Sequence, residues 1–179
     1  MEDNIGLKYE SVPSKFRWEG LGNISEGRST LGLDMPVLVY RLFQYTLKDV
    51  LAREYGAEHA AALYRAAGHL AGIEFAKNEL SLSGEFDFFV ANLVRRLAEL
   101  KMGILRVEQA DIEKLQFTLS VAEDLDCSGL PITGETVCDY DEGFIAGILE
   151  AYTGKKIDVK EIDCWASGGR ICRFSVIPR

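Results

Sequence analysis

Apolar residues recur three and four positions apart in three stretches of the first two thirds of the chain. This spacing places them on one face of a helix and predicts helices over residues 34–55, 57–78 and 85–101. In the first helix the apolar positions cover a wide face, so we expect much of that helix to be buried. In the second helix, Gly68 and Gly72 lie four residues apart and leave a groove that admits another helix closely.

Farther along the chain, apolar and polar residues alternate, which is the pattern of a strand with one buried face. Such stretches at 104–111 and 115–123 predict two antiparallel strands, and those at 157–164 and 170–177 predict a hairpin. A helix is predicted between the two pairs, over residues 141–153. This order is typical of an α+β fold in which the N-terminal helices pack on an antiparallel sheet.

The chain has 179 residues, of which 47% are hydrophobic, and this suffices for one sizeable core. Residues 1–33 are polar and rich in glycine, and we interpret them as an N-terminal extension, a loop with at most one short strand. Residues 34–179 are then expected to form a single domain.

The charge of the chain limits the partners it can bind. The net charge is -8, the isoelectric point is about 4.9, and no cluster of Lys and Arg stands out. Such a chain repels phosphate backbones, so we expect no direct binding of nucleic acid. No run of about 18 apolar residues is present to span a membrane, and the acidic start at residues 1–4 lacks the features of a signal peptide. We therefore expect a reducing, cytoplasmic setting.

All four cysteines lie in the last third of the chain, at Cys127, Cys138, Cys164 and Cys172. Cysteines interleaved with acidic residues around a glycine turn indicate a structural zinc site in the C-terminal segment 127–179. We expect Cys138, Cys164 and Cys172 as ligands, and the fourth ligand is open. Buried free thiols and two disulfides are the alternatives, and the expected reducing setting disfavours disulfides.

The same segment resembles a known family. The run Cys-Asp-Tyr-Asp-Glu-Gly-Phe-Ile-Ala-Gly at 138–147, then Glu161 with Cys164, and then Cys-Arg-Phe at 172–174 resemble the 4-vinyl reductase domain. This family includes sensor domains of aromatic-responsive transcription activators and short proteins described as hydrocarbon-binding. The resemblance implies a structural zinc ion held by Cys138, Glu161, Cys164 and Cys172.

One geometric objection applies to Glu161 as the fourth ligand. Residues three apart in a regular strand face opposite sides, so Glu161 and Cys164 converge only if the strand bulges or ends between them. Cys127 is therefore the rival fourth ligand, and Asp139 and Asp163 are weaker rivals.

The resemblance also implies a fold and a function. The fold is related to subunits of the transport-particle tethering complex and to the ligand-binding domain of nitric-oxide signalling. The implied function is an intracellular binding domain that senses or carries a small hydrophobic or aromatic molecule. As candidates for the lining of an apolar pocket we select the aromatic residues Phe86, Phe89, Phe117, Tyr152 and Trp165. The His and Trp pair that holds a phenolic hydroxyl in the sensors has no counterpart here, which favours a less polar or larger ligand.

Two other functions remain as alternatives. The family name implies an enzyme or accessory protein that reduces a vinyl group of a tetrapyrrole, but no dinucleotide-binding motif occurs in the chain. The transport-particle relatives imply a scaffold subunit without a ligand. We assign no catalytic residue, because His59 and His69 lie about 15 Å apart along one predicted helix and no nucleophile accompanies either.

The apolar breadth of the first helix predicts a partner. Val37, Leu38, Val39, Tyr40 and Phe43 are consecutive or nearly so, and a helix that is apolar around much of its surface must be covered. We expect a homodimer, in which the N-terminal extension extends as an arm across the two-fold interface.

Overall fold

The computed structural model describes residues 13–179, which fall into two compact units. The first unit ends at Asp34 and contains two short helical segments, η2 (Trp18–Leu21) and α1 (Ile24–Gly27). The predicted N-terminal extension thus contains helical turns among its described residues, and its residues 1–12 lie outside them. The second unit runs from Met35 to Arg179 and contains the sheet, the remaining helices and all four cysteines.

The second unit contains every helix and strand that the hydrophobic pattern predicts. These are α2 (Val37–Tyr55), α3 (Ala57–Glu79), α4 (Phe86–Glu99), β1 (Ile104–Asp111), β2 (Gln116–Ala122), α5 (Asp139–Thr153), β3 (Ile157–Asp163) and β4 (Cys172–Pro178). The strands form one antiparallel sheet in the order β1-β2-β4-β3, so the two predicted hairpins are joined through β2 and β4. The predicted α+β fold is confirmed.

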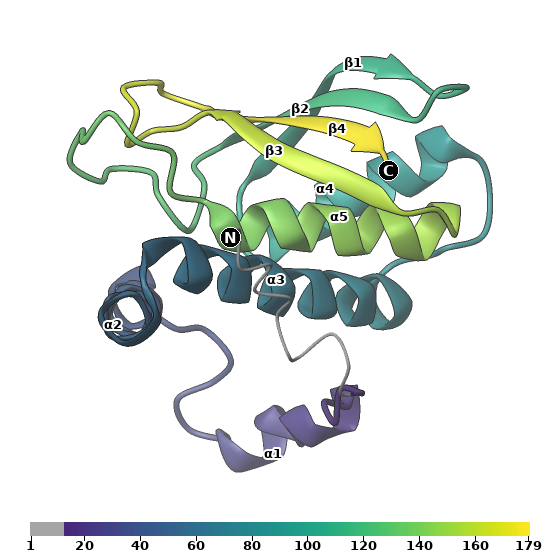
Figure 1. Ribbon diagram of the computed structural model, residues 1–179. Helices are drawn as coiled ribbons and strands as arrows, with labels where there is room; N and C mark the ends of the chain where they lie inside the picture. The colour runs from purple at the N-terminus through teal and green to yellow at the C-terminus, as the bar shows by residue number, and fades with distance from the viewer. Residues whose placement is uncertain (1–12) are drawn as a thin grey trace. The chain divides into compact units, whose positions relative to one another are not determined.

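Helix α5 lies between the sheet and α3 (Figure 1). Its apolar side faces the sheet, where Phe144, Ile148 and Leu149 are buried. The sheet contributes buried residues from its two central strands, with Phe117 of β2 opposite Val176 of β4 in the register. The core of the second unit is thus a layer between α4, α5 and one face of the sheet.

Helices α3 and α5 touch backbone to backbone through four glycines, Gly68, Gly72, Gly143 and Gly147. A Cβ atom at Gly68 would lie 2.0 Å from the carbonyl oxygen of Tyr140, and one at Gly147 would lie 2.2 Å from that of His69. Both distances are far shorter than any tolerated contact, so only glycine permits this approach. The groove predicted from Gly68 and Gly72 is confirmed, and Gly143 and Gly147 complete it from the other helix.

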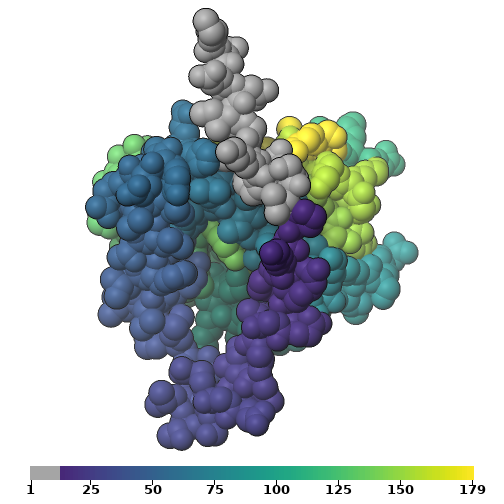
Figure 2. Space-filling view, turned by 60° about the horizontal axis from the view of Figure 1, so that its bottom comes forward, coloured from purple at the N-terminus to yellow at the C-terminus, as the bar shows by residue number. Residues whose placement is uncertain are grey.

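Helix α2 differs from expectation, because its apolar face is exposed. Gln44 is the one residue of this helix that is buried. Leu38, Leu42 and Phe43 are 75%, 63% and 68% exposed, and Figure 2 shows the blue residues of α2 at the surface. The expectation that much of this helix is buried is wrong for the single chain, because the helix packs mainly through polar side chains, as described below. No helix within residues 13–179 is long and apolar enough to cross a membrane.

The glycine contact yields a stability prediction. We expect Gly147→Ala to lower the free energy of unfolding by about 3 kcal/mol, because the new methyl group must push α5 away from the His69 carbonyl. Chemical denaturation followed by circular dichroism measures this loss. The matched control is Gly27→Ala in α1, where nothing lies within 4 Å of the added Cβ. Equal stability of the two variants would contradict the proposed tight contact.

Candidate metal centre and ligand cavity

Four segments that are distant in sequence bring the cysteines together at one end of the sheet. Cys127 lies in the loop after β2, Cys138 immediately precedes α5, Cys164 follows β3, and Cys172 begins β4. In Figure 1 the loop after β2, the start of α5 and the β3–β4 connection meet at this end. All four thiols are buried, and their Sγ atoms lie within 4.8 Å of one another. The three cysteines expected as ligands are thus adjacent, and Cys127 joins them.

A local irregularity of β3 makes this convergence feasible. The register of β3 against β4 shifts between Glu161 and Asp163, and the strand ends before Cys164. This is the bulge or strand end that the sequence required if Glu161 and Cys164 were to approach one site. A tight turn follows, in which the Cys164 carbonyl accepts hydrogen bonds from the backbone N–H groups of Ser167 and Gly169.

The spacing of the sulfur atoms fits a tetrahedral metal ion. In a tetrahedron with metal–sulfur distances of about 2.3 Å, neighbouring sulfur atoms lie about 3.8 Å apart. The Sγ atom of Cys138 lies 3.9 Å from those of Cys164 and Cys172, and Cys127 Sγ lies 3.0 Å from Cys172 Sγ. A buried set of sulfur donors with this spacing suits Zn²⁺ among the common metal ions of proteins.

The thiols of the cluster ionise unequally. Hydrogen bonds with the other three cysteines, Cys127 foremost, lower the pKa of Cys164. The same kind of contacts, again with Cys127 foremost, raise the pKa of Cys138. Four thiolates so close together repel one another in a buried site, so a fully ionised cluster requires a cation at its centre.

Glu161 lies beside the cluster, with its carboxylate directed at the backbone. Its Oε2 accepts a hydrogen bond of 3.0 Å from the N–H of Cys138, whereas its buried Oε1 has no hydrogen-bond partner among the described residues. Burial raises the pKa of Glu161 to about 8. The weaker rivals pair with cations, Asp139 with Lys48 at 2.8 Å and Asp163 with Arg173 at 2.8 Å. Glu161 as the fourth ligand stays a prediction.

A cavity of about 60 Å³ adjoins this centre, between α4, α5 and the sheet. Most of its wall is apolar, formed by Leu93, Leu97, Leu105, Leu119, Phe144 and Ile148. Its polar lining consists of Tyr40, Asp124, Asp126, Tyr140 and Asp141. The lining contains no Lys, Arg or His within the described part of the chain. The cavity is therefore apolar along its walls and acidic at one end.

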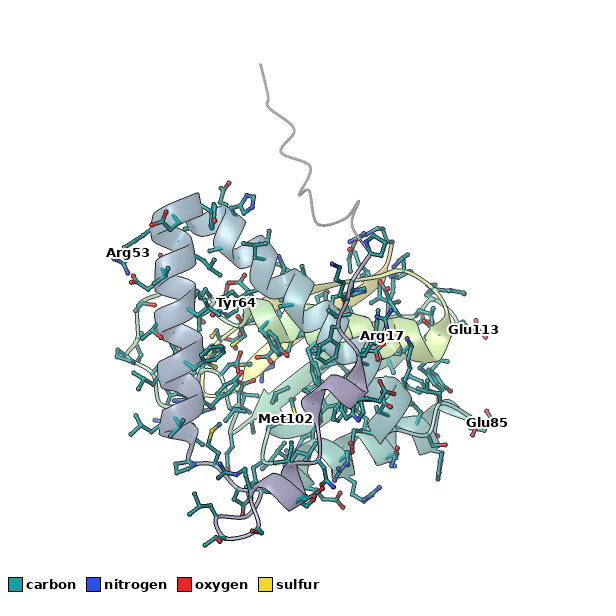
Figure 3. The ribbon with its side chains drawn as sticks, turned by 90° about the horizontal axis from the view of Figure 1, so that it is seen from below. Arg17, Arg53, Tyr64, Glu85, Met102 and Glu113 are labelled. Atoms are coloured by element: carbon teal, nitrogen blue, oxygen red, sulfur yellow. The ribbon has the colours of Figure 1, made fainter. Side chains whose placement is uncertain are left out.

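The acidic end is also where α2 is attached. Asp126 accepts hydrogen bonds from the Tyr40 hydroxyl at 2.7 Å and from Gln44 Nε2 at 2.6 Å. Its backbone carbonyl accepts a further hydrogen bond from the Tyr45 hydroxyl, and Arg41 donates to the carbonyl of Leu125. Figure 3 shows Tyr64 between α2 and α3, where its hydroxyl donates to the backbone carbonyl of Gln44. Helix α2 is thus held by polar contacts, which explains why its apolar side stays outside.

Burial dominates the electrostatics of the three carboxyl groups. Burial and the neighbouring Asp126 raise the pKa of Asp124 to about 7, against hydrogen bonds that its Oδ1 accepts from the N–H groups of Asp126 and Cys127. Burial also raises the pKa of Asp141 well above its ordinary value, and the carboxyl groups of Asp126 and Asp124 add to this shift. The Oδ2 atom of Asp141 is buried without a hydrogen-bond partner among residues 13–179. These groups lack the positive neighbours that normally accompany buried carboxylates.

The five aromatic residues expected to line the pocket lie elsewhere. Phe89 stacks on Tyr152 with ring centroids 4.0 Å apart, and Phe86 stacks on Phe117 at 5.1 Å. This cluster packs α4 and the end of α5 against β2, outside the cavity described above. Trp165 lies in the turn after β3, where its Nε1 donates to the carbonyl of Leu130. Contact of these residues with a ligand stays a prediction.

Sequence reasoning missed the polar end of the cavity. Capping of backbone N–H groups explains acidic residues near a strand end without any site, and Asp124 does accept two such hydrogen bonds. The overlooked signal was the run Asp124-Leu125-Asp126-Cys127, in which two acidic residues immediately precede a metal-ligand candidate. Tyr40 was assigned to an apolar face, although its hydroxyl bonds to Asp126.

Comparison with known families identifies the C-terminal part of this unit. Residues 117–178, from β2 to β4, match the model of the 4-vinyl reductase domain. The resemblance to this family is therefore confirmed for the segment that contains most of the cluster. Two uncharacterized proteins of Methanocaldococcus jannaschii match over longer stretches. MJ1642 is 27% identical over 82% of this chain and 80% of its own length, and MJ0150 is 28% identical over 88% and 84%.

Solved structures share the fold at low sequence identity. The phenol-responsive sensory domain of the transcription activator PoxR, with phenol, has a TM-score of 0.61 at 20% identity, covering 82% of this chain and 76% of that one. A vinyl-4-reductase family protein from Methanocaldococcus jannaschii has a TM-score of 0.57 at 17% identity, covering 83% and 84%. A trafficking protein particle complex subunit 3 from Naegleria fowleri, covalently bound to palmitic acid, has a TM-score of 0.64 at 12% identity, covering 80% and 95%. The predicted relation to transport-particle subunits is thus confirmed at the level of the fold.

Proposed function

We propose that this protein is a small-molecule binding domain whose ligand occupies the cavity between α4, α5 and the sheet. The observation that carries the proposal is the cavity itself, which has apolar walls and a few polar groups at one end. This combination is typical of sites that bind small molecules, because the walls supply affinity and the polar groups fix orientation. The fold supports the proposal, since a PoxR domain of this fold holds phenol and a trafficking subunit of this fold carries palmitic acid.

The size of the cavity limits the ligand. A cavity of about 150 Å³ accepts benzene, whereas the cavity here measures about 60 Å³. A ligand with an aromatic ring therefore requires the walls to move, and a short aliphatic ligand requires less movement. The unbranched side chain of Met102 and the neighbouring leucines of α4 can change rotamer to provide this room.

The cysteine cluster is proposed to hold one structural zinc ion through Cys127, Cys138, Cys164 and Cys172. The close approach of all four Sγ atoms supports this set, and Glu161, which the family resemblance favours as the fourth ligand, is the alternative through its unpartnered Oε1. Four protein ligands leave no open position, so the ion would stabilise the fold and activate no water. Thiolate ligation agrees with the reducing, cytoplasmic setting that we propose for the protein.

The apolar face of α2 is proposed to form a homodimer interface. Leu38, Leu42 and Phe43 are mostly exposed and lie on consecutive turns, with Leu47 and Val50 continuing the stripe. An apolar stripe along a helix of this length is typical of a surface that a second copy covers through a two-fold axis.

We expect purified protein to contain about one zinc ion per chain and Cys164→Ser to lose it, because the remaining ligands no longer saturate the ion. Mass spectrometry of the metal content measures this, and the melting temperature should fall in parallel. To identify the fourth ligand, Cys127→Ser should reduce zinc retention against a chelator more than Glu161→Gln does. The reverse order would assign Glu161, and metal-free native protein would exclude the site.

For the cavity, we expect Ile145→Trp to weaken binding of butan-1-ol and benzyl alcohol at least about tenfold, because the indole fills the space that the ligand needs. Methyl shifts of Leu93 and Ile148 in nuclear magnetic resonance spectra report binding at this place. The control Ile132→Trp changes an isoleucine that is 72% exposed and outside the cavity. Unchanged binding by Ile145→Trp, or no binding by the unmodified protein, would refute the cavity as a ligand site.

For the dimer, light scattering should return about twice the chain mass of 19.9 kDa. Leu42→Asp should shift the protein to the monomer, because a carboxylate would be buried in an apolar interface. Ile112→Asp, at a side chain that is 51% exposed on the β1–β2 connection, is the control and should leave the dimer intact. A monomer of the unmodified protein at high concentration would contradict the proposal.

A further inference from the structure

The polar end of the cavity offers chiefly hydrogen-bond acceptors. The Tyr40 hydroxyl already donates to Asp126, so its proton is not available to a ligand. The Oδ1 atom of Asp124 is engaged with two backbone N–H groups, and both carboxylate oxygens of Asp126 accept hydrogen bonds from α2. Asp141 differs from these, because its Oδ2 is buried beside the cavity without a partner among the described residues.

The basic side chains nearby are committed to other partners. Lys48 donates to the Val137 carbonyl and to Asp139. Arg41 donates to the backbone carbonyls of Leu125 and Asp124, and does not line the cavity. The acidic end therefore faces the cavity without a cation among the lining residues that the structure describes.

Two of the carboxyl groups are close enough to share one ligand atom. An oxygen of Asp124 and an oxygen of Asp141 lie within 4.8 Å of each other, with Cys138 Sγ at the same range. A donor placed between them would reach both at ordinary hydrogen-bond lengths of about 2.9 Å. Beyond this pair, the cavity continues along leucine and isoleucine side chains.

We propose that the ligand of this cavity is a small primary amine, whose ammonium group donates to Asp141 and Asp124 and whose apolar body lies along the leucine-lined wall. This inference rests on the proposed binding function and specifies the ligand class. An ammonium group carries three donors and a positive charge, which suits an end that has acceptors in excess and no cation. An alcohol offers one donor and no charge, and a carboxylate ligand meets charge of its own sign. The cavity should therefore discriminate by head group.

The test compares butylamine, butan-1-ol and butyrate, which share nearly the same apolar body. Calorimetric titration of the full chain should give butylamine an affinity at least about tenfold above butan-1-ol, with butyrate weakest, because hydrogen bonds to charged groups are the stronger ones. Asp141→Asn should weaken butylamine about tenfold while changing butan-1-ol by less than about twofold. The control is Asp87→Asn, an exposed aspartate in the first turn of α4, which should change neither.

The outcomes separate this inference from the function on which it rests. Equal affinity for the amine and the alcohol, with both lost in Ile145→Trp, would overturn the amine preference and leave the binding function intact. Absence of binding by all three compounds would overturn both. Amine binding that survives Asp141→Asn, or that Zn²⁺ displaces from the zinc-loaded protein, would show that the acidic end serves another cation. Because the three-compound series uses the unmodified chain, it decides the preference even where the Asp141 variant fails to fold.

Discussion

The backbone contact between α3 and α5 determines where everything else in the second unit can lie. Four glycines let the carbonyl oxygens of one helix occupy the space of side chains on the other. Helix α5 can therefore lie between α3 and the sheet, with its apolar side free to face the core. The start of α5 then places Cys138 against the other cysteines and Asp141 beside the cavity. A single methyl group at this contact would displace both features together.

One short loop connects the three features that bear on function. Residues 124–127 supply Cys127 to the cluster, Asp124 and Asp126 to the cavity, and the acceptors that hold α2. The proposed metal, ligand and dimer interface therefore share a physical link through hydrogen bonds and one stretch of backbone. A movement of Asp126 that accommodates a ligand would be felt by Tyr40 and Gln44, because both donate to the same carboxylate.

The parts of the site differed in how far the sequence could predict them. The cysteines were predictable, because thiols that cluster near a glycine turn have few other uses in a reducing setting. The bulge in β3 was predictable as a condition for convergence and is present. The cavity lining was not predicted, because aromatic residues such as Phe89 and Tyr152 fill a core equally well, and here they stack on each other.

By itself, the sequence determined the order of helices and strands, the antiparallel pairing, the resemblance to the 4-vinyl reductase domain and the close approach at Gly68 and Gly72. These follow from local periodicity and from residue types whose backbone demands are narrow. The tertiary structure alone decided that α2 turns its polar side inward, and that Asp126 and Asp141 gather at one cavity end. The reason is that local patterns report which face of an element is apolar, whereas the partner of a buried polar group comes from a distant segment that only folding brings near.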